Sequence, residues 1–481
     1  MKLLKNAIFA CLVFSFFISC YDDLDDVIRP TSSLDVKRFV WRAMNSTYLY
    51  KDKIPALGDD YFANQQELDD YLKGFSSPED LFYNGLVAEE DRFSFLVDDY
   101  RELEKNLDGI NVSNGMKYGL VRPDRNLPEI FGYVRYVLPN TSAEEQGVER
   151  GMIFNEVDGE QLTVDNYPRL LEPASYTIGL AQKNGEVLQA TGETISLVKQ
   201  EYTTNPVYIA KVLETEKDPV GYLVYNGFTG IFDEALNEAF VMFKSAGVTD
   251  LVVDLRYNPG GSTETAVDLG SMITGQFTGE IFYTEQWNDQ IQAELETLAP
   301  ESLIHSFNQK LSTGGSLTSL GLNKVYVLTT LSTASASELL INGLEPYIDV
   351  VQIGQRTTGK FQASTTLYDS YNFRRNSDVN LGHTYAVQPL IYKTLNAAGR
   401  TDYLDGLQPD IEIPEDYFNL GTLGDPEEPL LKAALNAILG QPQEFTPQAA
   451  DLKLIGEEGM HDLMFQRMYT KEQPELLNLK N

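Results

Sequence analysis

The chain has 481 residues, a formal net charge of −34 and a hydrophobic fraction of 42%. Its length predicts roughly two to four folded domains, and its composition is that of a soluble globular protein. Because phosphate contacts need clustered Lys and Arg, this acidic chain without a basic stretch argues against nucleic acid as a partner.

The first 20 residues have the order of a secretory signal. Lys2 and Lys5 precede an almost wholly apolar run from Ala7 to Ile18, which is shorter than the ~20 residues that span a membrane. The Ser-Cys pair that follows resembles a bacterial lipobox. We therefore expect residues 1–19 to be a signal peptide and Cys20 to be the lipidated first residue of the mature protein. Secretory cleavage at a nearby site is the alternative.

A tether is expected over residues 20–33. Its acidic stretch, Asp22 to Asp26, is similar to the surface-export signals of some Bacteroidetes lipoproteins and fits a solvated linker equally well. We expect a cell-envelope protein that is lipid-anchored in the outer membrane, either periplasmic or surface-exposed. Cleavage before Cys20 also removes Cys11, so neither an intrachain disulfide nor a cysteine metal site is expected. No cofactor and no metal are predicted.

Residues 34–105 are predicted to form a small helical N-terminal domain. Val36, Phe39, Val40 and Met44 recur at helical spacing, and a second helical stretch covers about 64–75. We expect this domain to pack against the rest of the chain without taking part in chemistry.

Residues 106–200 combine strands and a short helix with tight turns. Gly147 and Gly151 supply turns where a positive φ is expected. Ile153–Val157 reads as a strand that ends in an Asp158-Gly159 hairpin signal. The pattern resembles a PDZ domain, a fold that binds a peptide as an added strand.

The PDZ resemblance extends to a short motif upstream of these turns. Lys117-Tyr118-Gly119-Leu120 is similar to the loop that offers backbone N–H groups to a terminal carboxylate. The resemblance implies that Tyr118, Gly119 and Leu120 bind peptide. The alternative is that Gly119 only turns the chain.

Residues 201–425 alternate apolar strands with helices, which predicts an α/β domain. Residues 426–481 add one helix, about 428–439, and a polar tail. The expected strands are Gly221–Tyr225, Leu251–Leu255, Lys324–Thr330 and Val350–Ile353, and the expected helices are Phe232–Ser245, Thr263–Met272 and Ala336–Tyr347.

Ser335 is the first candidate catalytic residue. It follows the strand Lys324–Thr330 and directly precedes a helix, and Ser335 and Glu338 have the spacing of a capping box. A hydroxyl at the positive end of a helix suits a nucleophile, because a developing oxyanion meets free N–H groups there. On its own, this spacing marks a helix cap more often than a nucleophile. The assignment of Ser335 therefore depends on whether the sequence contains suitable partner residues.

The candidate partner residues belong to a motif that resembles a known family. Ser335-Ala336-Ser337-Glu338, followed about two dozen residues later by Lys360 in Thr-Thr-Gly-Lys, resembles the C-terminal processing (tail-specific) serine peptidases over about residues 106–415. The resemblance implies Ser335 as nucleophile and Lys360 as general base. A lysine serves as base only when it is neutral, so its pKa must fall by ~3 units from ~10.4, which burial can achieve. His305, His383 and His461 lie in no recognisable triad motif.

Asn258-Pro259-Gly260-Gly261 resembles the oxyanion loop of the same family. The resemblance implies that Gly260 or Gly261 donates one N–H and that Ala336 donates the other; an ordinary strand-to-helix turn is the alternative. Two positions depart from the family pattern. Ser364 stands where a Gln usually supports the lysine, with Gln362 nearby, and Pro346 replaces an Asp. The stretch 354–361 also resembles a phosphate-binding loop, but Phe361 lacks the hydroxyl that binds Mg²⁺.

These expectations describe an α/β protein with a crotonase-like ββα protease core, a PDZ-like domain at 106–200, a helical domain at 34–105 and a core at 201–425. The expected function is a serine endopeptidase that cleaves exported proteins or peptides near the C-terminus with a Ser335–Lys360 dyad. Its expected partners are substrates with accessible C-termini and, through the anchor, the membrane. The alternative is a catalytically weak or inactive peptide-binding lipoprotein with the same fold. An acyl-CoA enzyme of the crotonase type is disfavoured by the export signal.

Overall fold

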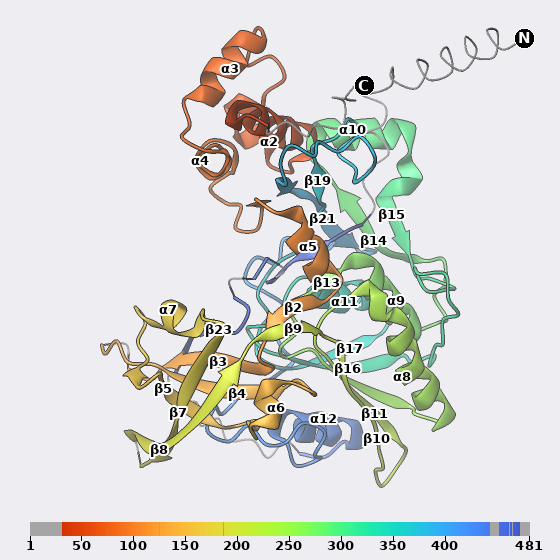
Figure 1. Cartoon of the computed structure of the whole chain (residues 1–481). Coiled ribbons are helices and arrows are strands. Elements are labelled where there is room, and N and C mark those ends of the chain that lie inside the picture. Colours follow the sequence, from red (N-terminus) through yellow and green to blue (C-terminus); the bar gives the residue numbers. More distant parts are fainter. Residues whose placement is uncertain are drawn as a thin grey trace, which may run out of the picture.

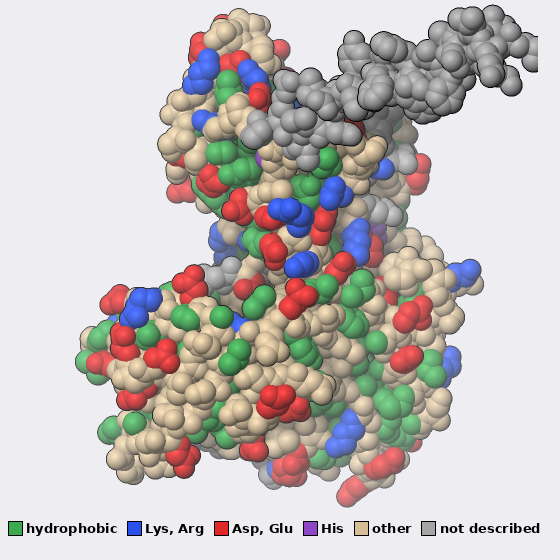
Figure 2. Space-filling model, in the orientation of Figure 1, with side chains coloured by type: hydrophobic (Ala, Val, Ile, Leu, Met, Phe, Trp, Pro, Cys, Tyr) green, Lys and Arg blue, Asp and Glu red, His purple; other side chains and the backbone are tan. Residues whose placement is uncertain are grey.

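The computed structural model describes residues 31–124, 126–185, 187–442, 452–460, 462–463 and 465–471. The predicted signal peptide, Cys20 and most of the tether lie outside the described residues. Within the described ranges, no helix combines the length and the apolar character needed to cross a bilayer. Figure 1 shows a helical lobe and a β-rich lobe, both attached to a mixed α/β body. On the face drawn in Figure 2, Lys and Arg side chains are interspersed with Asp and Glu.

The helical lobe begins with α2 (Ser33–Thr47), where the side chain of Ser32 accepts the N–H of Asp35 at 3.2 Å. Apolar side chains of α2 pack on α3 (Gln65–Lys73) and α4 (Pro78–Leu81), and side chains from 367–387 of the body join the same core. The lobe is therefore fixed to the body by shared packing. The remaining elements are η2 (Lys51–Lys53), η3 (Pro55–Leu57), η4 (Phe82–Leu86), α5 (Tyr100–Leu107) and a sheet of β1 (Phe95–Val97), β20 (Ala386–Gln388) and β19 (Leu367–Tyr368).

The β-rich lobe is built on one sheet with the strand order β23-β3-β4-β5-β7-β8. The predicted strand Ile153–Val157 is confirmed as β5, and Asp158 and Gly159, with φ of 51° and 76°, turn it back into β6. The bounds are β3 (Met116–Arg122), β4 (Phe131–Val137), β6 (Glu160–Gln161), β7 (Ser175–Asn184), β8 (Val187–Val198), β23 (Lys453–Glu457), α6 (Ser142–Glu145) and α7 (Tyr167–Leu171), with β2 (Ile110–Ser113) paired to β9 (Gln200–Thr203) beside them.

Two expectations for this part of the chain are wrong. Residues 117–120, predicted as a loop, lie inside β3, which pairs with β4 on one side and β23 on the other. Gly119 does not turn the chain; a Cβ there would lie 2.5 Å from the ring of Tyr133, so the close packing of that ring requires glycine. The polar tail expected after residue 440 also supplies two strands that were not predicted, β23 and β24 (Met468–Tyr469).

The body is built on a six-stranded sheet with the order β10-β11-β12-β16-β17-β22, parallel from β11 onward. Alternate side chains of β11, β12 and β16 point to opposite faces. One face packs on α8, α9 and α11, and the other packs on α12. The bounds are β10 (Val207–Leu213), β11 (Val220–Tyr225), η5 (Gly230–Phe232), α8 (Asp233–Ser245), β12 (Asp250–Asp254), α9 (Thr263–Ile273), β16 (Lys324–Thr329), α11 (Ala336–Leu344), β17 (Asp349–Gly354), β22 (Ile411–Glu412) and α12 (Pro429–Leu439).

The predicted strands and helices of this region are confirmed to within a few residues, with α11 ending at Leu344 instead of Tyr347. A second sheet of the body has the order β13-β24-β18-β21-β14-β15, so the last strand of the chain lies between two much earlier ones. Its bounds are β13 (Gly261–Ser262), β14 (Ile281–Gln286), β15 (Ile304–Ser306), β18 (Gln362–Ser364) and β21 (Leu390–Asn396), with α10 (Asp289–Leu298) and η6 (Pro300–Leu303) alongside.

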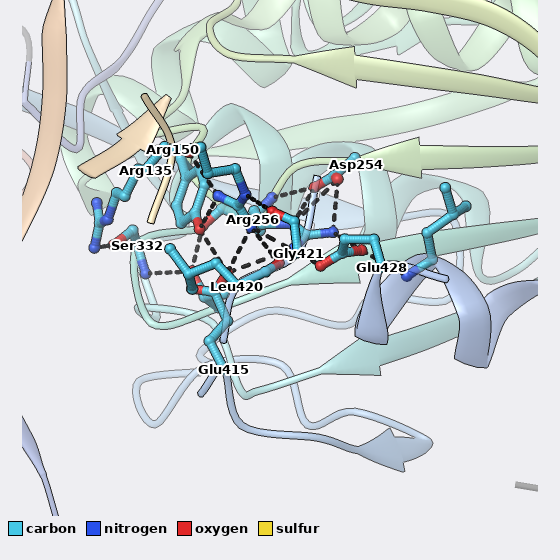
Figure 3. A network of polar contacts seen from close by, with 12 residues as sticks. Arg135, Arg150, Asp254, Arg256, Ser332, Glu415, Leu420, Gly421 and Glu428 are labelled. Carbon is cyan, nitrogen blue, oxygen red and sulfur yellow. Dashed lines mark hydrogen bonds and ion pairs between the residues drawn. The ribbon is translucent and has the colours of Figure 1, made fainter. Parts of the chain in front are cut away.

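A buried ionic network joins the β-rich lobe to the body (Figure 3). The guanidinium of Arg256, 1% exposed, pairs with Asp254 at 2.9 Å and with Glu428 at 2.7 Å. Glu428 also caps α12 by accepting the N–H of Leu431 at 2.9 Å. From the β-rich lobe, Arg150 donates to the carbonyls of Gly421 and Leu420 at 3.0 and 3.1 Å. The network therefore fixes both α12 and the β-rich lobe to the C-terminal end of β12.

Replacing Arg256 should destabilise the protein strongly. In an Arg256→Met variant two buried carboxylates lose their counter-charge, and we expect a loss of ~3–5 kcal/mol, measured as a lower urea midpoint. The control is Arg169→Met, whose 2.8 Å pair with Glu160 is exposed and should change stability by under ~1 kcal/mol. Equal losses in the two variants would contradict the role assigned to the network.

Candidate active site

Ser335 lies at the start of α11, directly after the turn that follows β16. Its backbone has φ of 69°, a conformation that residues with a side chain rarely adopt. The side chain is fully buried, and its Oγ has no hydrogen-bond partner among the described residues. Ser335 is the N-cap residue of α11 and has the capping-box arrangement with Glu338, while no hydrogen bond within the described part of the chain satisfies its hydroxyl.

One carboxylate organises the surroundings of Ser335. Glu338, on the first turn of α11 and fully buried, accepts the N–H of Ser335 at 2.7 Å and that of Lys360 at 2.9 Å through the same oxygen, Oε2. Its other oxygen accepts from the N–H of Gly359 at 2.7 Å and from the hydroxyl of Thr357 at 2.5 Å. Burial raises the pKa of Glu338 to about 6, and the four donors oppose that rise. The two predicted dyad residues are thus tied together through their backbones.

Lys360 is also fully buried, and its Nζ has no hydrogen-bond partner among the described residues. The amine lies 4.9 Å from the centre of the Phe93 ring. Burial lowers the pKa of Lys360 well below its usual value, and the positive charge of Arg467 lowers it further, while Asp91 and Glu338 act in the opposite direction. The side chain is therefore in the setting that favours a neutral amine.

No hydrogen bond joins Ser335 Oγ to Lys360 Nζ, since neither atom has a partner within the ranges that the structure describes. Catalytic hydrogen bonds are often long in enzymes without substrate and shorten on binding. Neither candidate support residue reaches the amine. Gln362 donates to the hydroxyl of Tyr50 at 3.0 Å, and Ser364 donates to Gln388 and to the carbonyl of Met468, both at 3.1 Å.

The surroundings of Lys360 include residues of the N-terminal region, for which no chemical role was expected. Phe93 packs on the amine, and Asp91 holds that segment by accepting the N–H groups of Phe93 and Ser94 at 2.8 and 2.9 Å and the hydroxyl of Tyr48 at 2.7 Å. No local motif marks these residues, because only the packing of the helical lobe on the body brings them to the site.

The glycine loop, residues 258–261, lies against the turn that carries Ser335, because β12 and β16 are parallel neighbours and both loops leave the same edge of the sheet. A Cβ on Gly260 would lie 2.6 Å from Ser335 Cβ and 3.0 Å from its Oγ. The N–H of Gly260 donates to Asn258 Oδ1 at 2.9 Å, so it is already used. Gly261, with φ of 137°, belongs to β13 and pairs with β24. Ala336 is the first residue of α11, where an N–H has no acceptor within the helix.

The predicted peptide-binding residues lie away from this turn, along β3. Tyr118 and Leu120 line a cavity of about 450 Å³ together with Tyr167 and Leu171 of α7. A separate cavity of about 180 Å³ runs from Tyr118 to Gly260 and Gly261 of the glycine loop. This second cavity therefore connects the predicted peptide-binding residues of the β-rich lobe with the glycine loop of the body.

Two of the three histidines pair with carboxylates elsewhere in the structure. His305 pairs with Glu285 at 2.8 Å and His383 pairs with Asp369 at 3.0 Å, while His461 lies outside the described residues. Within the described ranges, no group of three or more His, Cys, Asp or Glu side chains is arranged to hold a metal ion.

Comparisons with known proteins identify the family of the chain. A model of peptidase family S41 matches residues 219–413, and a model of the S41 N-terminal domain matches residues 35–95. The crystal structure of an S41 protease from Bacteroides fragilis superposes with a TM-score of 0.64 at 25% identity, covering 83% of this chain and 97% of that one.

Two relatives by sequence have related names. A carboxyl-terminal-processing protease from Picosynechococcus is 22% identical over 439 residues, which cover 89% of this chain and 94% of that protein. A chloroplastic C-terminal processing peptidase from Tetradesmus obliquus is 26% identical over 57% of this chain and 55% of its own length. The chain therefore belongs to peptidase family S41 and is a serine-type peptidase.

Proposed function

We propose that this protein is an endopeptidase that uses a Ser335–Lys360 dyad to cleave exported proteins or peptides near their C-termini. The observation that carries the proposal is the pair of buried, unpartnered groups, a serine hydroxyl and a lysine amine, whose backbones share one carboxylate oxygen of Glu338. Buried polar groups without partners are rare in folded proteins and often have a functional reason.

The chemistry follows from the state of the two groups. Neutral Lys360 turns toward Ser335, accepts the hydroxyl proton, and the Oγ attacks the carbonyl carbon of the substrate. The oxyanion is held by the N–H groups of Ala336 and Gly261, because that of Gly260 already serves Asn258. Lysine then gives its proton to the departing amine. A water molecule, deprotonated by the same lysine, releases the acyl group from Ser335.

The β-rich lobe supports cleavage near the C-terminus. β3, with Tyr118, Gly119 and Leu120, borders a cavity next to α7, and an extended peptide would be added as a strand on the side of β3 where β23 now lies. The relatives named above are C-terminal processing enzymes. With the lipid anchor expected at Cys20, the enzyme would act in the cell envelope at the outer membrane.

Removing either dyad group should abolish proteolysis. We expect Ser335→Ala to reduce cleavage of an unfolded, fluorescently labelled protein to background and Lys360→Met to reduce kcat by ~10²–10⁴-fold. Lys324→Met, which changes an exposed lysine paired with Asp349, should leave the rate unchanged. The alternative of an inactive peptide-binding protein predicts the same cleavage in Ser335→Ala and the parent protein.

The pH dependence should report the lowered pKa of Lys360. Only the deprotonated amine accepts the serine proton, so kcat/KM should rise with pH through the lysine pKa and reach its plateau well below ~10.4. A stopped assay from pH 5 to 10 measures the profile. A rate that is still rising near pH 10 would contradict the assignment.

Glu338→Gln should impair both stability and rate. An amide can accept hydrogen bonds only through its oxygen, so at least one of the donors now bound by the second carboxylate oxygen loses its acceptor, at ~1–3 kcal/mol for each group left unpaired. We expect a lower melting temperature and a ~10–100-fold lower kcat, because the two dyad residues are no longer held together. Glu345→Gln, at the other end of α11 and paired with Arg400, is the matched control.

A further inference from the structure

The chain covers its own predicted peptide groove. β23 is added antiparallel to the edge of β3, with Lys453 opposite Arg122 and Glu457 opposite Gly119. Beyond the strand, the N–H of Glu458 donates to the carbonyl of Tyr118 at 2.9 Å. This is the geometry in which an extended peptide is added to a sheet edge, and Figure 1 shows β23 labelled beside β3.

The side chains of this segment fit the groove by shape and by charge. Ile455 packs against the apolar core of the β-rich lobe. Glu458 forms an ion pair with Lys117 at 2.7 Å. Glu457 forms an ion pair with Arg135 and accepts the hydroxyl of Ser332 at 2.6 Å. Two successive acids therefore meet two cations of the lobe, and one of them reaches the turn that carries the nucleophile.

The same segment continues into the catalytic cleft. Met468 and Tyr469 of β24 pair in parallel with Gly261 and Ser262, and Tyr469 also pairs with Ser364. The backbone of the glycine loop is therefore engaged by the chain itself. The carbonyl oxygen of Arg467 lies 2.7 Å from the position that a Cβ of Gly260 would take, and the Oγ of Ser335 lies 3.0 Å from that same position.

We propose that residues 452–460 and 465–471 are an intramolecular occupant of the peptide groove and the catalytic cleft, and that substrates compete with them as extended peptides carrying two successive acidic residues for Lys117 and Arg135. The inference deepens the proposed function by naming the substrate class and the competitor. Competition between substrate and segment does not require the segment to be cleaved.

Binding to an inactive protein tests the inference separately from catalysis. The full-length Ser335→Ala protein is compared with a full-length variant that also carries Glu457→Gln and Glu458→Gln. The probe is a fluorescent synthetic peptide with the sequence of residues 452–460, followed by anisotropy. Because the weakened segment leaves the groove more readily, we expect the probe to bind the triple variant at least ~10-fold more tightly than Ser335→Ala alone, a gain of ~1.4 kcal/mol.

Two controls distinguish recognition of the acidic side chains from a general weakening of the contacts between the segment and the groove. A probe in which both acids are Gln should bind the triple variant ~10-fold more weakly than the acidic probe, and Lys117→Gln should remove most of that difference. Glu427→Gln, which changes an exposed acid paired with Lys432, should leave probe binding unchanged. Equal affinities of the two probes, or equal affinities of the two proteins, overturn the inference.

Hydrogen exchange measures displacement of the segment in a protein that carries no substitution in the groove. In the Ser335→Ala protein, excess unlabelled acidic probe should speed the exchange of amides in residues 453–458, because the segment is displaced. Saturating binding of the probe without faster exchange there would show that it binds elsewhere. If these binding results hold while no Ser335-dependent cleavage is found, the proposed function fails and the peptide site stands.

Discussion

The geometry of the site depends on one buried carboxylate. Glu338 binds the backbone N–H groups of Ser335, Gly359 and Lys360 together with a hydroxyl, and it thereby joins the turn before α11 to the loop after β17. A carboxylate with all of its lone pairs engaged can remain buried at modest cost. The same interaction holds Ser335 in its strained backbone conformation, since that strain persists only where the surroundings fix it.

The surroundings of the Lys360 amine are formed by a different part of the molecule. The amine is buried and lies over the ring of Phe93, and the positive charge of Arg467 lowers its pKa further. The guanidinium of Arg467 donates to the carbonyl of Phe93 and lies 4.3 Å from the centre of the Phe95 ring. The charge state of the candidate base is thus a property of the assembled protein and not of its local sequence.

The sequence predicted the parts of the site that local spacing encodes. Ser335 was a candidate because a strand, a turn and a helix follow one another in a short stretch, whereas Lys360, Gly260 and Gly261 were named because their motifs resemble those of the C-terminal processing peptidases. Glu338 was recognised only as a possible cap, since its contacts with Gly359 and Lys360 form across a loop. Phe93, Asp91 and the two strands of the tail were missed, because contacts over hundreds of residues leave no periodic signal.

The position of β24 has a consequence for how the enzyme is made. A polypeptide is synthesised from its N-terminus, and β24 lies between β13 and β18, which are both produced far earlier. The second sheet therefore stays incomplete until residues 468 and 469 have left the ribosome. A nascent chain that stops before residue 468 lacks the strand that borders the glycine loop, so β13 and β18 remain without the strand that lies between them until residues 468 and 469 are available to fold.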